Sequence, residues 1–299
     1  MAETLMVNEI FGPTIQGEGH NNVGGLAYFV RLSGCDSNCK WCDTLQARDI
    51  NSGTKMTYME IANEIRKLHG KSEKRVMRII ITGGNPCMQN LELLSEFLTN
   101  EFNTDKNENQ TSNCHTQICL ETQGTLPFPN FYPDYVVFSP KPPSAFENQK
   151  NGQDIDVIVD YYNHNISIFN ISWNPKNDND DNTSNIINAK IYSPIIECKI
   201  VVFVREDLKY ANRVFNELYK VINNDTYYTD ILGGNLSLTN QYPFTIQIGT
   251  PYPYKKSIKE VITAREIIEY LYSDDCDLDN NMLQKIRVLP QVHRILGVE

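Results

Sequence analysis

Short apolar runs alternate along this chain with longer segments of helical periodicity, and this alternation restricts the fold more than any other feature. Runs rich in β-branched and aromatic residues predict strands at 5–11, 27–34, 76–82, 116–122, 135–139, 199–203 and 244–249. Helical patterns lie between them at 57–70, 90–100, 207–222 and 263–273. Strands that alternate with helices indicate a parallel sheet, either doubly wound or closed towards a barrel.

Polar and glycine-rich motifs follow the predicted strands directly. GCDSNCKWCDT, TGGNP, ETQGT, SPKPP and QIG each come after a different strand. In parallel α/β folds, the loops at the carboxyl ends of the strands carry the functional site. We therefore expect these motifs to meet in one place.

Composition and charge exclude several classes of protein. The 299 residues are 40% hydrophobic and carry a net charge of −10, which argues against nucleic acid as a partner. No window approaches the roughly 18 consecutive apolar residues of a membrane-spanning helix, and the first residues lack the features of a signal peptide. We expect a cytoplasmic protein with one domain, 1–299, and Asn-rich polar insertions near 104–114 and 174–185.

Three cysteines, Cys35, Cys39 and Cys42, fall within eight residues. This spacing suits a common metal centre, because three thiolates can bind three irons of a 4Fe-4S cube and leave the fourth iron open. A structural zinc site normally takes four protein ligands, so a Cys3His site that recruits His20 or His69 stays open as an alternative. The other cysteines are scattered and are expected to be ordinary packed thiols: Cys87, Cys114, Cys119, Cys198 and Cys276.

The cysteine spacing resembles that of the radical S-adenosylmethionine superfamily. TGGNP resembles the GGEP element of that superfamily, with Asn85 in place of the glutamate. The resemblance implies a 4Fe-4S cluster whose open iron binds S-adenosylmethionine.

Further motifs narrow the resemblance to the 7-carboxy-7-deazaguanine synthase family: TIQGEG, FVRLSGC, CDT, ETQGT, SPKPP and the terminal LPQVHRILGVE. It implies a partial, six-stranded β/α barrel of the TIM type, usually as a homodimer. The implied reaction is the ring contraction of 6-carboxy-5,6,7,8-tetrahydropterin with loss of ammonia, in the biosynthesis of queuosine and related deazapurines. The implied cofactors are the 4Fe-4S cluster, S-adenosylmethionine and Mg²⁺, with an electron donor such as flavodoxin or ferredoxin.

The resemblance also assigns roles to individual residues, none of them as a catalytic acid or base. The implied substrate contacts are Ile15, Gln16, Gly17, Glu18, Arg31, Thr82, His293 and Glu299. Arg31 suits a planar carboxylate on chemical grounds, because guanidinium donates two parallel hydrogen bonds; the alternative is an ordinary ion pair.

The implied contacts to S-adenosylmethionine are Trp41, Asp43, Gly84, Asn85, Glu121, Ser139, Lys141 and Gln247. For Trp41, core packing is an equal alternative. Cys35, Cys39 and Cys42 are the implied cluster ligands. Thr44 is the implied Mg²⁺ ligand, although its place in the sequence also suits a helix cap.

Three other functions remain to be weighed. A glycyl-radical activating enzyme shares the cysteine spacing, but it would not use TIQGEG, CDT or the C-terminal QVH sequence. A non-catalytic zinc or iron–sulfur module would bind another protein. A degenerate family member would bind substrate without turnover because of Asn85.

Overall fold

The computed structural model describes residues 3–16, 23–72, 76–103, 115–128, 130–148, 151–165, 194–224, 243–250 and 261–291. Both Asn-rich insertions lie outside these residues. The strands are β1 Thr4–Ile15, β2 Leu26–Leu32, β3 Thr54–Thr57, β4 Arg78–Gly83, β5 Gln117–Thr122, β6 Tyr135–Phe138, β7 Ile195–Val202, β8 Phe244–Ile248 and β9 Ile286–Pro290. The α-helices are α1 Tyr58–His69, α2 Leu94–Asn103, α3 Ile155–Asn165, α4 Arg205–Asn224, α6 Ala264–Leu271 and α7 Asn280–Leu283.

The described strands form one sheet in the order β3-β1-β2-β4-β5-β6-β7-β8-β9. From β2 to β9 all neighbours are parallel, whereas β1 pairs antiparallel with both β2 and β3. The sheet is open, with β3 and β9 at its edges. The mixed α/β class and the parallel sheet expected from the sequence are confirmed.

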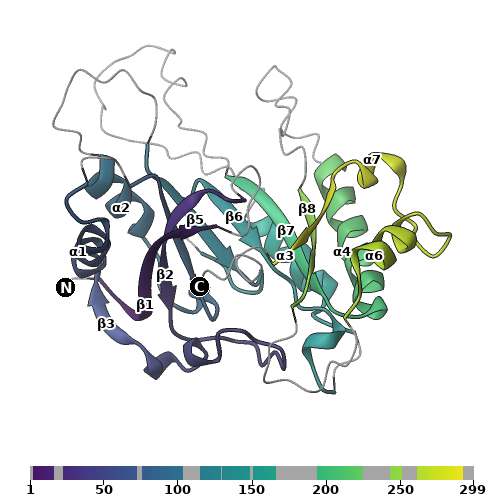
Figure 1. Cartoon of the computed structure of the whole chain (residues 1–299), viewed down its shortest axis with the longest axis horizontal. Helices are drawn as coiled ribbons and strands as arrows, with labels where there is room; N and C mark the ends of the chain where they lie inside the picture. Colours follow the sequence, from purple (N-terminus) through teal and green to yellow (C-terminus); the bar gives the residue numbers. More distant parts are fainter. Residues whose placement is uncertain are drawn as a thin grey trace, which may run out of the picture.

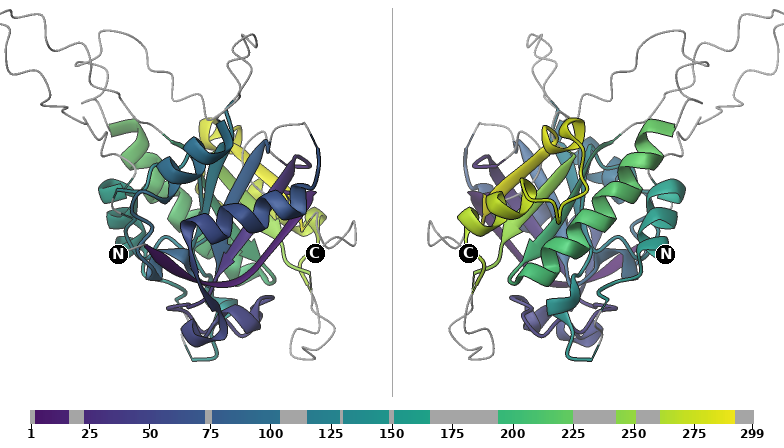
Figure 2. Two further views of the ribbon diagram at one scale, coloured as in Figure 1. Left: turned by 90° about the vertical axis from the view of Figure 1, so that its left-hand side faces the viewer. Right: turned by 90° about the vertical axis from the view of Figure 1, so that its right-hand side faces the viewer.

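The two faces of the sheet have different neighbours, and β4 shows this well. Ile79 and Ile81 point into the large apolar core that the helices complete, while Ile80 belongs to a smaller cluster on the opposite face. Side chains alternate between faces along a strand, so this pattern follows from the backbone. Figures 1 and 2 show the helices outside the sheet, where α1 packs on β1, α2 on β5 and α4 on β7. The face with the smaller cluster holds the site described below.

Local signals in the sequence set several of the helix ends. Thr57 and Glu60 form the expected capping box at the start of α1, and Gly70, with φ +69°, follows its last turn. Helix α2 begins at Leu94, later than the sequence predicts. Leu93 has φ +60° and therefore cannot belong to a right-handed helix.

Four elements were not expected from the sequence: β3, β9, α3 and α7. Strand β3 has only four residues and no apolar alternation. Strand β9 carries Arg287 among apolar residues, and α3 is rich in β-branched and aromatic residues that do not favour helix. Each is stabilised by its place against the rest of the fold, which a local pattern does not reveal. No helix in the described ranges is long and apolar enough to cross a membrane.

Candidate active site

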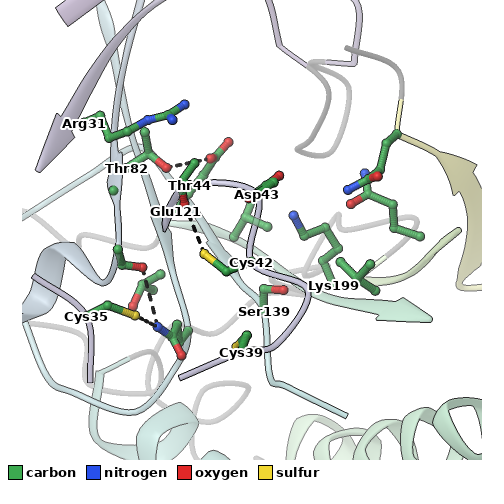
Figure 3. Close-up of a pocket in the computed structure, with 18 of the residues that line it drawn as sticks. Arg31, Cys35, Cys39, Cys42, Asp43, Thr44, Thr82, Glu121, Ser139 and Lys199 are labelled. Carbon is green, nitrogen blue, oxygen red and sulfur yellow. Dashed lines mark hydrogen bonds between the residues drawn. The ribbon is translucent and has the colours of Figure 1, made fainter. Parts of the chain in front are cut away.

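A pocket opens where the parallel strands end, on the face opposite the helices (Figure 3). The strand register brings the motifs together there: Arg31 lies beside Thr82, and Val201 beside Gln247. Among the residues that line the pocket are Ile15, Arg31, Cys35, Cys39, Trp41, Cys42, Asp43, Thr44, Thr82, Gly84, Glu121, Ser139, Lys141 and Gln247. The expectation that the strand-end motifs meet in one place is confirmed.

The three motif cysteines line the same pocket and lie close enough to influence one another electrostatically. Burial raises the pKa of the Cys39 thiol, and the nearby charge of Lys141 opposes that shift. Burial also raises the pKa of Cys35, against hydrogen bonds from the Ser37 backbone and the Gln123 side chain. The structure therefore places three thiols together, and polar neighbours of Cys35 and Cys39 oppose the effect of burial on these two.

These residues fit a 4Fe-4S cluster better than a single metal ion. In the part of the chain that the structure describes, no three His, Cys, Asp or Glu side chains are arranged to hold one ion. The cysteines of a cube bind different irons, so their sulfurs need not converge on one point. His69 lies at the end of α1, where its Nδ1 is 2.8 Å from the Tyr28 hydroxyl, and His20 lies outside the described residues.

The TGGNP turn packs directly on the cysteine loop. A Cβ atom on Gly84 would lie 2.3 Å from the Gly34 carbonyl oxygen and 2.7 Å from Cys35 Cβ, so no side chain fits there. The backbone N–H of Asn85 donates to the same Gly34 oxygen at 2.7 Å. Glycine at position 84 thus allows the ends of β2 and β4 to touch beside the first cysteine.

Arg31 lies on the pocket wall with few competing partners. Its guanidinium is 3.1 Å from Glu9 and 5.2 Å from the ring centre of Phe11. Its Nε is buried and makes no hydrogen bond. On the neighbouring strands, Thr82 donates to Glu121 at 3.1 Å. Arg31 therefore forms the ion pair that was the alternative to substrate binding, and its Nε has no hydrogen-bond partner among the described residues.

The opposite wall offers both charged and neutral polar groups. Lys141 Nζ donates to the Ser139 carbonyl at 2.8 Å and lies 3.3 Å from its hydroxyl. Gln247 is 1% exposed, and neither polar atom of its side-chain amide has a hydrogen-bond partner in the described part of the chain. A buried amide without partners is costly, so this side chain is suited to binding a polar ligand. Trp41 donates to Ser144 at 3.1 Å and packs on Phe203, as the packing alternative predicts.

Thr44 precedes a short 3-10 helix, but its side chain makes no capping hydrogen bond. Its hydroxyl is 3.7 Å from Cys42 Sγ, at the pocket wall beside Asp43 (Figure 3). The position of Thr44 is therefore not explained by the capping alternative.

Unlike the other predicted contacts to S-adenosylmethionine, Asn85 is fully buried and does not line the pocket. Its Nδ2 donates to Asp36 at 2.8 Å and to Thr125 at 3.0 Å, and its Oδ1 accepts from Thr122 at 2.9 Å. The side chain thus links three loops beneath the site.

Five further predicted residues lie away from the pocket wall or outside the described residues. Gln16, at the end of β1, is buried, and its side-chain amide has no hydrogen-bond partner within the described ranges. It does not line the pocket. The remaining four are outside the described residues: Gly17, Glu18, His293 and Glu299.

Sequence reasoning missed several residues on the pocket wall, of which Lys199 is the most notable. It is 7% exposed and lies on β7, on the same face as Val201. A signal was present, since one lysine within the apolar run KIVVF must point to one face of its strand. Other missed residues are Phe11, Thr14, Phe29, Ser37, Phe203, Thr250 and Gln291.

Comparisons with known proteins agree with this geometry. A family model described as a 4Fe-4S single cluster domain matches residues 15–122, which include all three motif cysteines. The 7-carboxy-7-deazaguanine synthase of Bacillus subtilis (strain 168) is 29% identical over 99% of this chain and 97% of its own. The enzyme of the same name from Bacillus cereus is 26% identical over 98% of this chain and 96% of its own.

Among solved structures, the crystal structure of QueE from Escherichia coli matches with a TM-score of 0.49 and 18% sequence identity, over 96% of this chain and 93% of that one. The similarity to this family comes from the sequence relatives and from the iron–sulfur region that holds the cysteine motif. Over nearly its whole length, the chain is similar to the 7-carboxy-7-deazaguanine synthases of these two organisms.

Proposed function

We propose that this protein is a 7-carboxy-7-deazaguanine synthase, which converts 6-carboxy-5,6,7,8-tetrahydropterin into 7-carboxy-7-deazaguanine with loss of ammonia. One observation carries the proposal: a single pocket joins the three motif cysteines to Arg31 and Thr82. The nearly full-length relatives of that name support it. No group in the described pocket needs to act as a general acid or base for this assignment.

In this proposal Cys35, Cys39 and Cys42 hold a 4Fe-4S cluster. When bound, the cluster and S-adenosylmethionine supply the radical that removes a hydrogen atom from the substrate. The protein contributes position, because a reactive centre must be held within contact distance of one carbon atom. Lys141 and Ser139 offer a cation and a hydroxyl for the cofactor's carboxylate and ribose.

The remaining assigned contacts to S-adenosylmethionine are proposed from their places on the pocket wall: Trp41, Asp43, Gly84, Glu121 and Gln247. Asn85 is proposed to act only through its backbone and the loops that it joins, since its side chain already has partners. Ile15, Gln16, Gly17, Glu18, His293 and Glu299 keep the substrate roles implied by the family motifs.

Arg31 is proposed to bind the substrate carboxylate. Replacement of Arg31 by Ala is expected to raise KM by about 10- to 100-fold, since a hydrogen bond to a charged group contributes about 1.5–3 kcal/mol. The KM of Arg31→Lys should fall between that of the wild type and that of Arg31→Ala, because lysine keeps the charge but loses the planar guanidinium group. Steady-state kinetics check this, with inhibition by a tetrahydropterin that lacks the carboxylate as the control. An equal loss of affinity for both pterins would assign Arg31 to the ring instead.

Thr44 is proposed to ligate Mg²⁺ together with substrate oxygens. Mg²⁺ commonly keeps water and substrate ligands and takes few from the protein. We expect Thr44→Ala to raise the Mg²⁺ concentration for half-maximal rate about tenfold, equivalent to about 1.4 kcal/mol of binding free energy. Thr44→Ser should retain the wild-type value because it keeps the hydroxyl. Identical Mg²⁺ curves for Thr44→Ala and the wild type would remove this residue from the metal site.

Several broader features complete the proposal. We propose that strands β2, β4, β5, β6, β7 and β8 form the partial six-stranded barrel implied by the family motifs, within one domain over 1–299. β1, β3 and β9 extend it. We further propose a homodimer in the cytoplasm that receives electrons from a flavodoxin or ferredoxin, as the same motifs imply.

An anaerobic assay tests the proposed function. Protein reconstituted with iron and sulfide is incubated with 6-carboxytetrahydropterin, S-adenosylmethionine, Mg²⁺ and a reductant, and 7-carboxy-7-deazaguanine is sought by mass spectrometry. Product should require every component. Cleavage of S-adenosylmethionine to 5′-deoxyadenosine without this product would point to another radical reaction.

A further inference from the structure

Gln123 lies against the first cysteine of the motif, at the end of β5. Its side chain is 3% exposed, and its Nε2 donates to Cys35 Sγ at 2.8 Å and to the Gly84 carbonyl at 3.5 Å. Both neighbours are acceptors. The amide nitrogen must therefore face them, because the reverse orientation would place a carbonyl oxygen against a thiolate and another carbonyl.

The backbone after Gln123 is held in place by packing. Gly124 has φ +75°, and a Cβ atom there would lie 2.9 Å from the Phe138 ring. The amide of Gly124 lies 3.4 Å from the Thr122 hydroxyl. A tight turn thus aims the Gln123 side chain at the cysteine loop, which belongs to a segment 88 residues away in the sequence.

The polar neighbours of the three cysteines differ. Cys42 lies 3.7 Å from the Thr44 hydroxyl, which is beyond a strong contact, and Cys39 has the charge of Lys141 nearby. Cys35 has a directed amide donor at short distance. Hydrogen bonds to the sulfurs are among the factors that set the reduction potential of an iron–sulfur cluster.

We propose that Gln123 is a positioning residue that tunes the cluster: its amide N–H donates to the Cys35 thiolate and favours the reduced state. The proposal rests on the assignment of the cysteines to a 4Fe-4S cluster. Reduction takes one electron from a low-potential donor and changes the cluster from the 2+ to the 1+ state. The extra negative charge is shared by the thiolates, so a hydrogen bond to Cys35 stabilises the reduced form more than the oxidised form.

Replacement of Gln123 by Leu, which has a similar size and no donor, tests this proposal. At a fixed solution potential, we expect the ratio of reduced to oxidised cluster to fall tenfold. That change equals a midpoint about 59 mV lower for a one-electron couple. The measurement is an anaerobic redox titration followed by electron paramagnetic resonance, with iron and sulfide determined in the same samples.

Gln291→Leu is the matched control, because Gln291 lines the same pocket and its Oε1 accepts from the Thr250 amide at 2.7 Å. Its midpoint should equal that of the wild type. Gln123→Met is a second variant without a donor and should reproduce the shift seen with Leu. An unchanged midpoint in a fully loaded Gln123 variant overturns the proposal. Loss of the cluster from both Gln123 variants, with Gln291→Leu fully loaded, also overturns it and assigns Gln123 to assembly.

The results that would contradict the proposed function differ from those that would contradict the role of Gln123. If wild-type protein binds no iron and sulfide, the cluster assignment itself is wrong. If it binds a cluster but forms no 7-carboxy-7-deazaguanine, the synthase assignment is wrong, and the midpoint still decides the role of Gln123.

Discussion

Cys39→Ala is expected to lose the iron–sulfur cluster and all turnover. Cys39 is 6% exposed and lies in the pocket with the other two motif cysteines. Its carbonyl accepts from the Cys42 amide at 3.2 Å, so the loop has a defined shape. A three-cysteine site has no spare protein ligand, because its fourth iron is left open for the cofactor. Iron and sulfide content, visible absorption and product formation measure the effect.

Cys276→Ala is the matched control for this experiment. Cys276 is half-buried, and its thiol lies 3.8 Å from Asn212 Oδ1, in a segment that does not line the pocket. The control should retain the wild-type iron and sulfide content and rate. Full activity in a variant with only two motif cysteines would show that the motif does not ligate a cluster.

Asn85→Glu is expected to destabilise the protein strongly, although glutamate is the residue in the superfamily's GGEP element. The new carboxylate would be buried next to Asp36 and would lose the two hydrogen bonds that the Asn85 amide donates. An uncompensated buried charge costs about 3–5 kcal/mol. Denaturant unfolding of wild type and variant measures this difference in the free energy of unfolding.

A charge exchange distinguishes this account from simple overpacking. Adding Asp36→Asn to Asn85→Glu restores one carboxylate and one amide, with donor and acceptor reversed. We expect the double variant to recover at least half of the lost stability, whereas Asp36→Asn alone should not be stabilising. If Asn85→Glu is as stable as the wild type and binds S-adenosylmethionine more tightly, then the side chain at position 85 reaches the cofactor.

The parallel strands other than β9 could be predicted from the sequence, because their apolar runs are continuous and bounded by turns. YVVF and KIVVF are examples, at β6 and β7. Elements whose stability comes from neighbours could not be predicted. Strand β3 is one such element, since its four residues pair with β1 at a distance of about 50 positions in the sequence.

The site could be predicted in outline because parallel strands bring their carboxyl ends to one edge. This geometric rule was enough to place Cys35, Thr82 and Glu121 around one pocket. The partners of individual side chains could not be predicted. The contact of Gln123 with Cys35 and the burial of Asn85 against Asp36 depend on how separate loops pack, which no local pattern reports.

The most direct test of the central claim is the stoichiometry of product to S-adenosylmethionine in the reconstituted protein. A synthase of this family is expected to regenerate S-adenosylmethionine, so 7-carboxy-7-deazaguanine should exceed the S-adenosylmethionine consumed by many fold. Cluster-loaded protein that consumes S-adenosylmethionine and forms no 7-carboxy-7-deazaguanine would contradict the assignment.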